Sequence, residues 1–321
     1  MASSYLGIHT QIRQNNRKSV QLLIAFPLLL LAVVFAAIAS LAFLPEDSTA
    51  TWDDIWVMFF SAAPYVILIT TVWFLVAYFS HSKIINSAVH SQTLERRDNM
   101  RVYNLTENLC MELGMTMPKL RIIEDKALNA FASGLSEKTY TVTLTRGIIN
   151  VLDDEELKGV IAHELMHIRN RDVRLLVISI IFVGIFSLLV QILFRSILYG
   201  GHRRRGNDNK GGGAIIVIMI IVVIAYFLSM LFRFALSRKR EYMADAGAAE
   251  ITKNPRALAS ALRKISGNSH LESIDSEDVK EMFIDNYPDN KDEGLGFMGG
   301  MDRWFATHPP IEKRIEVLEQ F

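Results

Sequence analysis

The chain has 321 residues, half of them hydrophobic, and its 34 basic and 34 acidic side chains give a formal net charge of zero. This composition and the single cysteine exclude intrinsic disorder, a collagen-like chain and a disulfide-rich secreted scaffold. Four stretches carry no charged residue, and each is close to the roughly 20 apolar residues with which a helix crosses a bilayer. They are Leu22–Leu44, Ile55–Phe79, Leu175–Phe194 and Ala214–Phe232. The sequence therefore predicts a membrane protein with a soluble part.

The charges around the first two apolar stretches indicate an orientation. Residues 1–21 carry three basic side chains and no acidic one, whereas residues 45–54 carry four acidic side chains. Because basic residues near the ends of spans stay in the cytoplasm, we expect the N-terminus inside, and the chain from about His81 onward to start there too. The first apolar stretch is too long for a removable signal peptide, and no small-residue cleavage site follows before Pro45.

The second pair of apolar stretches is harder to orient. The loop between them, residues 195–213, holds five basic side chains and one acidic one on what should be the outer side. Either both stretches cross the bilayer despite this charge, or the hairpin dips into the membrane without crossing it. Both alternatives return the chain to the cytoplasm at Arg233–Arg240, so the expected location of the soluble part does not depend on the choice.

This pattern divides the chain into four segments. Residues 1–80 form an N-terminal segment with two transmembrane helices, and residues 175–232 form the second hydrophobic hairpin. Residues 81–174 and 233–321 are the two halves of the soluble part. We therefore expect a mostly helical α+β membrane protein, with four hydrophobic spans and a small β-sheet in the soluble part.

Local patterns predict elements within the two halves. Apolar side chains recur at helical spacing from Leu94 to Leu113, and Gly114 is suited to end that helix. Three short strands follow, at Leu120–Glu124, Ala130–Ser133 and Tyr140–Thr145. Asp153 and Glu156 form a capping-box start for the next helix. In the second half, Pro255 opens a helix, Gly294–Gly300 is a glycine-rich loop, and Pro309-Pro310 opens a last helix.

The helix that starts near Asp153 contains the sequence His163-Glu164-Leu165-Met166-His167. Residues four apart share one helical face, so both imidazoles can reach one metal ion, while Glu164 lies about 100° away and can address a water on that metal. The alternative is a helix with two exposed histidines and a surface glutamate. Apolar neighbours such as Val160 and Ile161 argue against it, because a buried glutamate between two histidines is costly without a metal.

Two histidines do not complete a catalytic zinc site, which has three protein ligands and an open position. One extended form of the motif places another histidine six residues beyond the second, but Val173 stands there. Further along, Glu241 and Asp245 are one helical turn apart. Glu241 could ligate the metal while Asp245 binds the outer nitrogen of a ligand histidine. On spacing alone this assignment is weak, because acidic pairs four residues apart usually lie on a solvated helix surface.

Taken together, these motifs resemble the HtpX-type membrane zinc metallopeptidases, which are gluzincins related to the CAAX prenyl proteases. The resemblance rests on the HExxH helix, the second hairpin, and the segments Asn129–Gly134, Ser237–Asp245 and Thr307–Pro310 with Arg314. It implies one zinc ion per chain, with His163, His167 and Glu241 as ligands. It also implies that Glu164 is the general base and that Asp245 is the hydrogen-bonding partner of His163.

The resemblance suggests roles for three further parts of the sequence. His308, six residues before Arg314, is the candidate donor to the tetrahedral oxyanion, although a cap or surface role is the alternative. Arg314 is expected to anchor its helix or to orient the site. Residues Asn129, Ala130, Phe131 and Ala132 would present a strand edge to an extended peptide. The alternative is a core strand, and Phe131 is expected to be a core residue.

The expected function is that of a zinc metalloendopeptidase at the cytoplasmic face of a bacterial inner membrane. The family suggests a stress-related role in protein quality control, with membrane or misfolded proteins as substrates. The expected partners are polypeptides and the lipid bilayer; no sustained basic face indicates nucleic acid. The rivals are a CAAX-type prenyl-protein protease, an intramembrane protease, and a non-catalytic membrane scaffold that zinc stabilises.

Overall fold

The computed structural model describes residues 8–43, 48–200, 212–234, 238–271, 282–284 and 309–321. It is mostly helical, with one small mixed sheet, which confirms the expected fold class. The chain forms two compact units. The sheet unit comprises Met1–Arg17, Ser80–Val177 and Phe234–Phe321, and the apolar unit comprises Lys18–Phe79 and Ile178–Arg233.

Four long helices supply the apolar unit: α1 (Ile8–Phe43), α2 (Trp52–Ala88), α6 (Asp172–Gly200) and α7 (Gly212–Phe234). Three stretches among the described residues are long and apolar enough to cross a membrane, namely Ile12–Phe43, Trp52–Ala88 and Asp172–Arg195. In α7 the corresponding apolar stretch, Ile216–Ser229, is shorter, so the described residues support three of the four expected spans. Aromatic rings join three of these helices, because Phe182 of α6 stacks on Phe26 of α1 and on Phe74 of α2.

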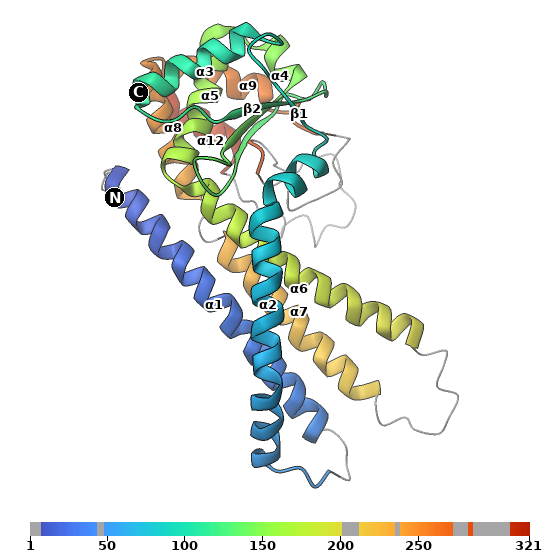
Figure 1. Cartoon of the computed structure of the whole chain (residues 1–321). Helices are drawn as coiled ribbons and strands as arrows, with labels where there is room; N and C mark the ends of the chain where they lie inside the picture. Colours follow the sequence, from blue (N-terminus) through green and yellow to red (C-terminus); the bar gives the residue numbers. More distant parts are fainter. Residues whose placement is uncertain (1–7, 44–47, 201–211, 235–237, 272–281, 285–308) are drawn as a thin grey trace. The chain divides into compact units, whose positions relative to one another are not determined.

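The sheet unit contains four strands in the order β1-β2-β4-β3 (Figure 1). They are β1 (Gln92–Thr93), β2 (Lys119–Ile123), β3 (Ala130–Ser133) and β4 (Thr141–Thr145). β2 and β4 are parallel, whereas β3 pairs with β4 in the antiparallel sense at the end of the sheet. The three predicted strands are confirmed to within one residue. β1 was not predicted, because two residues carry no periodicity.

The helices of the sheet unit begin and end at the residues that cap them. α3 (Met100–Leu113) ends at Gly114, whose φ of 59° is left-handed, as the sequence predicts. It starts later than the apolar spacing suggests, because the Asn99 side chain accepts a hydrogen bond from Val102 N. The predicted capping box is present at the start of α5 (Asp154–Arg169). The other helices of the sheet unit are α4 (Arg146–Val151), α8 (Arg238–Thr252), α9 (Pro255–Ile265) and α12 (Ile311–Leu318).

Helix α5 lies at the centre of this unit and packs against α3, α8, α9 and β3 (Figure 1). Its contact with α8 is close because α8 carries Gly247, where a Cβ would lie 2.5 Å from Cε of Met166. Close packing of α5 and α8 matters for function, because the histidine motif lies on α5 and the acidic pair lies on α8.

Candidate metal centre

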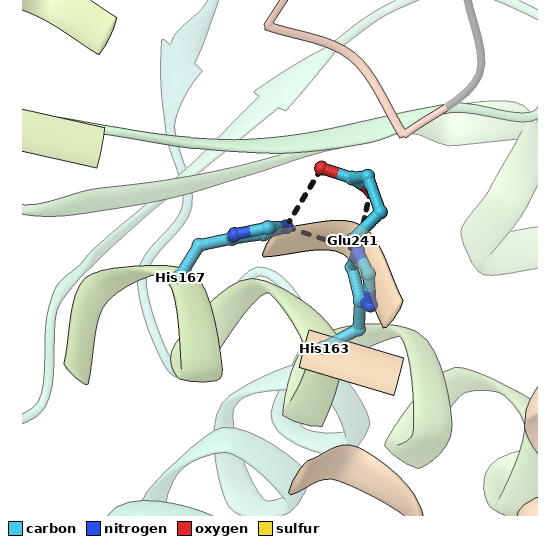
Figure 2. Close-up of side chains that lie close together, drawn as sticks. All are labelled: His163, His167 and Glu241. Atoms are coloured by element: carbon cyan, nitrogen blue, oxygen red, sulfur yellow. Dashed lines mark hydrogen bonds and ion pairs between the residues drawn. The ribbon is translucent and has the colours of Figure 1, made fainter. Parts of the chain in front are cut away.

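Two histidines from α5 and one glutamate from α8 meet in the interior of the sheet unit. The Nε2 atoms of His163 and His167 are 3.1 Å apart. Glu241 lies 3.5 Å from each ring, through Oε2 to His163 Nε2 and through Oε1 to His167 Nε2. Figure 2 shows the three side chains directed toward one another from the two helices. The structure thus brings together the three residues that the family resemblance implied as ligands.

The geometry of these three side chains fits a zinc ion. Nitrogen and oxygen ligands bind zinc at about 2.0–2.2 Å, so a tetrahedral arrangement separates two donor atoms by roughly 3.3–3.6 Å. The observed separations are close to this range. Among the described residues, this is the one group of three His, Cys, Asp or Glu side chains whose donor atoms lie within 4.8 Å of one another. Two imidazoles and one carboxylate are also ligands that suit zinc.

The electrostatic environment of the two imidazoles favours a cation. Burial lowers the pKa of His163, but the charge and hydrogen bond of Asp245, together with Glu241, outweigh it and raise the pKa above its usual value. Burial likewise opposes protonation of His167, yet Glu241 and Asp172 raise its pKa to about 10. The surrounding carboxylates therefore stabilise positive charge at this point. A divalent metal that displaces the protons is stabilised by the same negative charges.

Asp245 and Arg314 both contact His163, and Arg314 Nη2 lies 3.3 Å from its Nε2. Asp245 Oδ1 lies 2.9 Å from His163 Nδ1, the ring nitrogen that faces away from the three-residue cluster. Burial raises the pKa of Asp245, but the charges of Arg314 and His163 outweigh it and hold that pKa below its usual value. Asp245 therefore stays ionised and accepts from Nδ1, which leaves Nε2 for a metal. Arg314 lies on α12 and is 1% exposed.

Asp172 is a candidate site residue that the sequence analysis missed. Its Oδ2 lies 3.2 Å from His167 Nδ1, so each histidine of the motif has a carboxylate on its outer nitrogen. Asp172 is the first residue of α6, and a turn with Arg171 at a φ of 61° precedes it. The signal in the sequence was an acidic residue five positions after His167. That signal is weak, because only the turn at Arg171 directs the Asp172 side chain back toward His167.

Glu164, the candidate base, lies on α5 and is 3% exposed. It is one residue along the helix from His163, about 100° around the axis. His308, the candidate oxyanion donor, lies outside the described residues.

The candidate substrate strand, Asn129–Ala132, lies beside α5. Thr145 N donates to Asn129 O, so the antiparallel alternation directs the backbone N–H and C=O of Ala130 and Ala132 away from β4. Ala130 O accepts a hydrogen bond of 2.9 Å from Ile284 N. All four residues of β3 are buried. The Phe131 ring is fully buried and packs edge-on against Phe283, as expected for a core residue.

Comparisons with known proteins extend over most of the chain. The sequence profile of peptidase family M48 matches residues 96–321. A "Protease HtpX homolog" of Bacteroides fragilis is 53% identical over 323 residues, covering 99% of each chain. A homolog with the same description from Listeria monocytogenes is 36% identical and covers 96% of this chain and 98% of its own. One from Lactobacillus acidophilus is 32% identical and covers 97% of this chain and 99% of its own. The crystal structure of S. mikatae Ste24p, 19% identical, aligns with a TM-score of 0.48 over 96% of this chain and 66% of that chain.

Proposed function

Because this chain belongs to peptidase family M48 and is a membrane-bound zinc metalloprotease, we propose that it cleaves membrane or misfolded polypeptides at the cytoplasmic face of a bacterial inner membrane. The family expected from the sequence is confirmed. One observation carries the proposed chemistry: His163, His167 and Glu241 converge at zinc-ligand spacing beside a buried Glu164. A role in protein quality control is consistent with the HtpX description of the relatives.

In this mechanism His163, His167 and Glu241 hold the zinc, and Glu164 moves the proton. When bound, zinc supplies Lewis acidity, which lowers the pKa of water towards neutrality and polarises the scissile carbonyl. Glu164 accepts the proton of the attacking water and then passes it to the leaving amine. Burial of Glu164 keeps bulk water from competing for that proton.

The remaining site residues orient the machinery and the substrate. Asp245 holds His163 in one tautomer, and Arg314 holds Asp245. His308 is proposed as a donor to the oxyanion. An extended peptide adds to the outer edge of β3, where the N–H and C=O of Ala132 face away from β4. A peptide that extends as far as Ala130 must take the place of Ile284 N.

The cytoplasmic location rests on the flanking charges. Residues 1–21 are basic and residues 45–54 are acidic, which favours an N-terminus inside the cell. Tethering to the bilayer restricts the accessible polypeptides to membrane proteins and to chains near the surface. To test this placement, the exposed Glu137 is replaced by cysteine and labelled from either side of inverted membrane vesicles. Labelling only from the periplasmic side would contradict the placement.

The substitution Glu164→Gln in the full-length protein, purified in detergent, tests the mechanism. We expect retained zinc and a loss of at least about 100-fold in cleavage of an unfolded protein, because the base is removed while the ligands remain. Glu155→Gln, an exposed glutamate on the same helix, is the matched control and should cleave normally. Unchanged cleavage by Glu164→Gln would overturn the mechanism. Offering a farnesylated peptide beside an unfolded membrane protein tests the substrate, and exclusive cleavage of the farnesylated peptide would favour a prenyl-protein protease.

A further inference from the structure

The N-terminal turns of α1 belong to the sheet unit, although they precede the residues that match the M48 profile. Asn15 on these turns is 1% exposed. Its Nδ2 donates one hydrogen bond of 2.7 Å to Asp172 Oδ1 and one of 2.8 Å to Asn170 O. A buried amide thus joins the N-terminal helix to the turn that follows the histidine motif.

Asp172 connects this amide to the metal centre. Its Oδ1 accepts from Asn15, while its Oδ2 lies 3.2 Å from His167 Nδ1. The two oxygens therefore have different partners, and fixing one fixes the direction of the other. Arg240 Nη1 is 3.9 Å from Asp172 Oδ1, beyond hydrogen-bond range, so the amide is the closer of these two partners. Rotation of the His167 ring is restrained by its Nδ1 partner, and this restraint directs Nε2 toward His163 and Glu241.

We propose that Asn15 and Asp172 are positioning residues for the metal ligand His167, so that the helix before the first apolar stretch is part of the metal site. The inference rests on the proposed zinc-ligand role of His167. It gives each ligand histidine a carboxylate partner on its outer nitrogen. Asp245 and Arg314 fix His163, and Asp172 and Asn15 fix His167, in each case through a carboxylate held by a donor from a distant part of the chain.

A simpler possibility is that these N-terminal turns only dock on the sheet unit. Asn16 separates the two ideas, because its Oδ1 accepts a hydrogen bond of 3.0 Å from Arg171 Nη1. Asn16 therefore also joins α1 to the turn after the motif, but through Arg171 and not through the carboxylate that contacts His167. Asn15→Leu and Asn16→Leu are a matched pair of substitutions on one helix.

The test is zinc affinity of the full-length protein, measured by competition with a chromogenic chelator, together with the visible absorption spectrum of the Co²⁺-loaded protein. Asp172→Asn should weaken zinc binding about 10-fold to 100-fold, and Asn15→Leu about 10-fold, because such supporting groups contribute this much to metal affinity. Both should shift the cobalt bands, which report ligand geometry. Asn16→Leu should leave the affinity and the spectrum unchanged.

Two further variants keep the outcome decisive. Adding Asn15→Leu to Asp172→Asn should weaken binding little further, because Asn15 acts through Asp172. Asn15→Asp keeps the volume but replaces the donor by a carboxylate facing Asp172, and should weaken binding at least as much as Asn15→Leu. Equal losses in Asn15→Leu and Asn16→Leu, additive losses in the double variant, or normal affinity in both Asn15 variants would overturn the proposal. Normal zinc binding by Glu241→Ala would instead contradict the metal site itself.

Discussion

Arg314 and Asp245 form a two-point ion pair in the interior of the sheet unit. Arg314 Nε lies 2.9 Å from Asp245 Oδ2 and Nη2 lies 2.8 Å from Oδ1, with 1% and 2% of the two side chains exposed. The same Asp245 oxygen, Oδ1, is 2.9 Å from His163 Nδ1. The guanidinium from α12 also lies beside two of the metal-ligand candidates, with Nη2 3.3 Å from His163 Nε2 and Nη1 3.5 Å from Glu241 Oε2.

Arg314→Lys should weaken zinc binding by about 10-fold, because an ammonium cannot contact both carboxylate oxygens with a planar fork. Arg314→Met, which leaves Asp245 without its buried cation, should also lower the free energy of unfolding by about 3–5 kcal/mol. Chelator competition and thermal unfolding measure the two effects. Arg263→Lys is the control, because Arg263 pairs with Glu319 where both side chains are half exposed. Zinc affinity equal to wild type in Arg314→Lys would contradict the positioning role.

Glu241→Ala should leave the purified protein with little zinc and no cleavage, because two histidines alone do not hold a catalytic zinc ion. Metal analysis after dialysis measures the zinc content. Glu250→Ala changes an exposed glutamate on the same helix, α8, and should retain one zinc per chain. Normal zinc content in Glu241→Ala would remove Glu241 from the ligand set.

Ala132→Pro tests the proposed use of β3 by a peptide. The Ala132 N–H faces away from β4, so proline removes no hydrogen bond of the sheet. It does remove a donor that an added strand would use, which should raise KM about fivefold, the equivalent of one hydrogen bond. Zinc content and kcat should be unchanged. Steady-state kinetics on an unfolded protein substrate give both constants, and an unaltered KM would place the peptide elsewhere.

Glu156 provides a pH-dependent contribution to the stability of α5. It accepts hydrogen bonds from Lys264 Nζ and Ser260 Oγ at 2.6 and 2.7 Å. Burial opposes ionisation, but these bonds outweigh it and hold the pKa of Glu156 below its ordinary value of 4.5. A carboxyl with a lowered pKa in the folded state stabilises that state above the unfolded pKa, and the contribution is lost as pH falls through the folded pKa.

Glu156→Gln should therefore lower the free energy of unfolding by about 1–3 kcal/mol at pH 7, and the difference from wild type should shrink as the pH falls below 4.5. Chemical unfolding at several pH values measures this. Both proteins should be metal-free, so that acid release of zinc does not contribute. A difference that stays constant down to the most acid condition would show that shape, rather than charge, accounts for the effect.

Much of the sheet unit could be predicted from the sequence because its signals are local. The capping box of α5, the glycine at the end of α3 and the two histidines four residues apart each depend on neighbours within one or two helical turns. The acidic pair on α8 was different. Spacing left it ambiguous, and only the packing of α8 on α5 brings Glu241 to the histidines.

Contacts between distant segments could not be predicted in this way. Asn15 meets Asp172 across 157 positions of sequence, and nothing in the residues around Asn15 distinguishes it from a polar helix residue at a membrane boundary. The position of the Asp172 side chain depends on a left-handed turn at Arg171. Arginine rarely adopts this conformation, so the local sequence does not predict the turn.

The metal centre constrains how the chain threads the bilayer. His167 precedes α6 and Glu241 follows α7, yet both belong to one cluster. An odd number of crossings between them would put the two ligands on opposite sides of the membrane, so α6 and α7 must either both cross or both stay on one side. The same parity applies to α1 and α2, because Asn15 and Asp172 are hydrogen-bonded. Assembly of the site thus requires the two helices of each pair to cross the membrane together or not at all, whatever the charge of the loop between them.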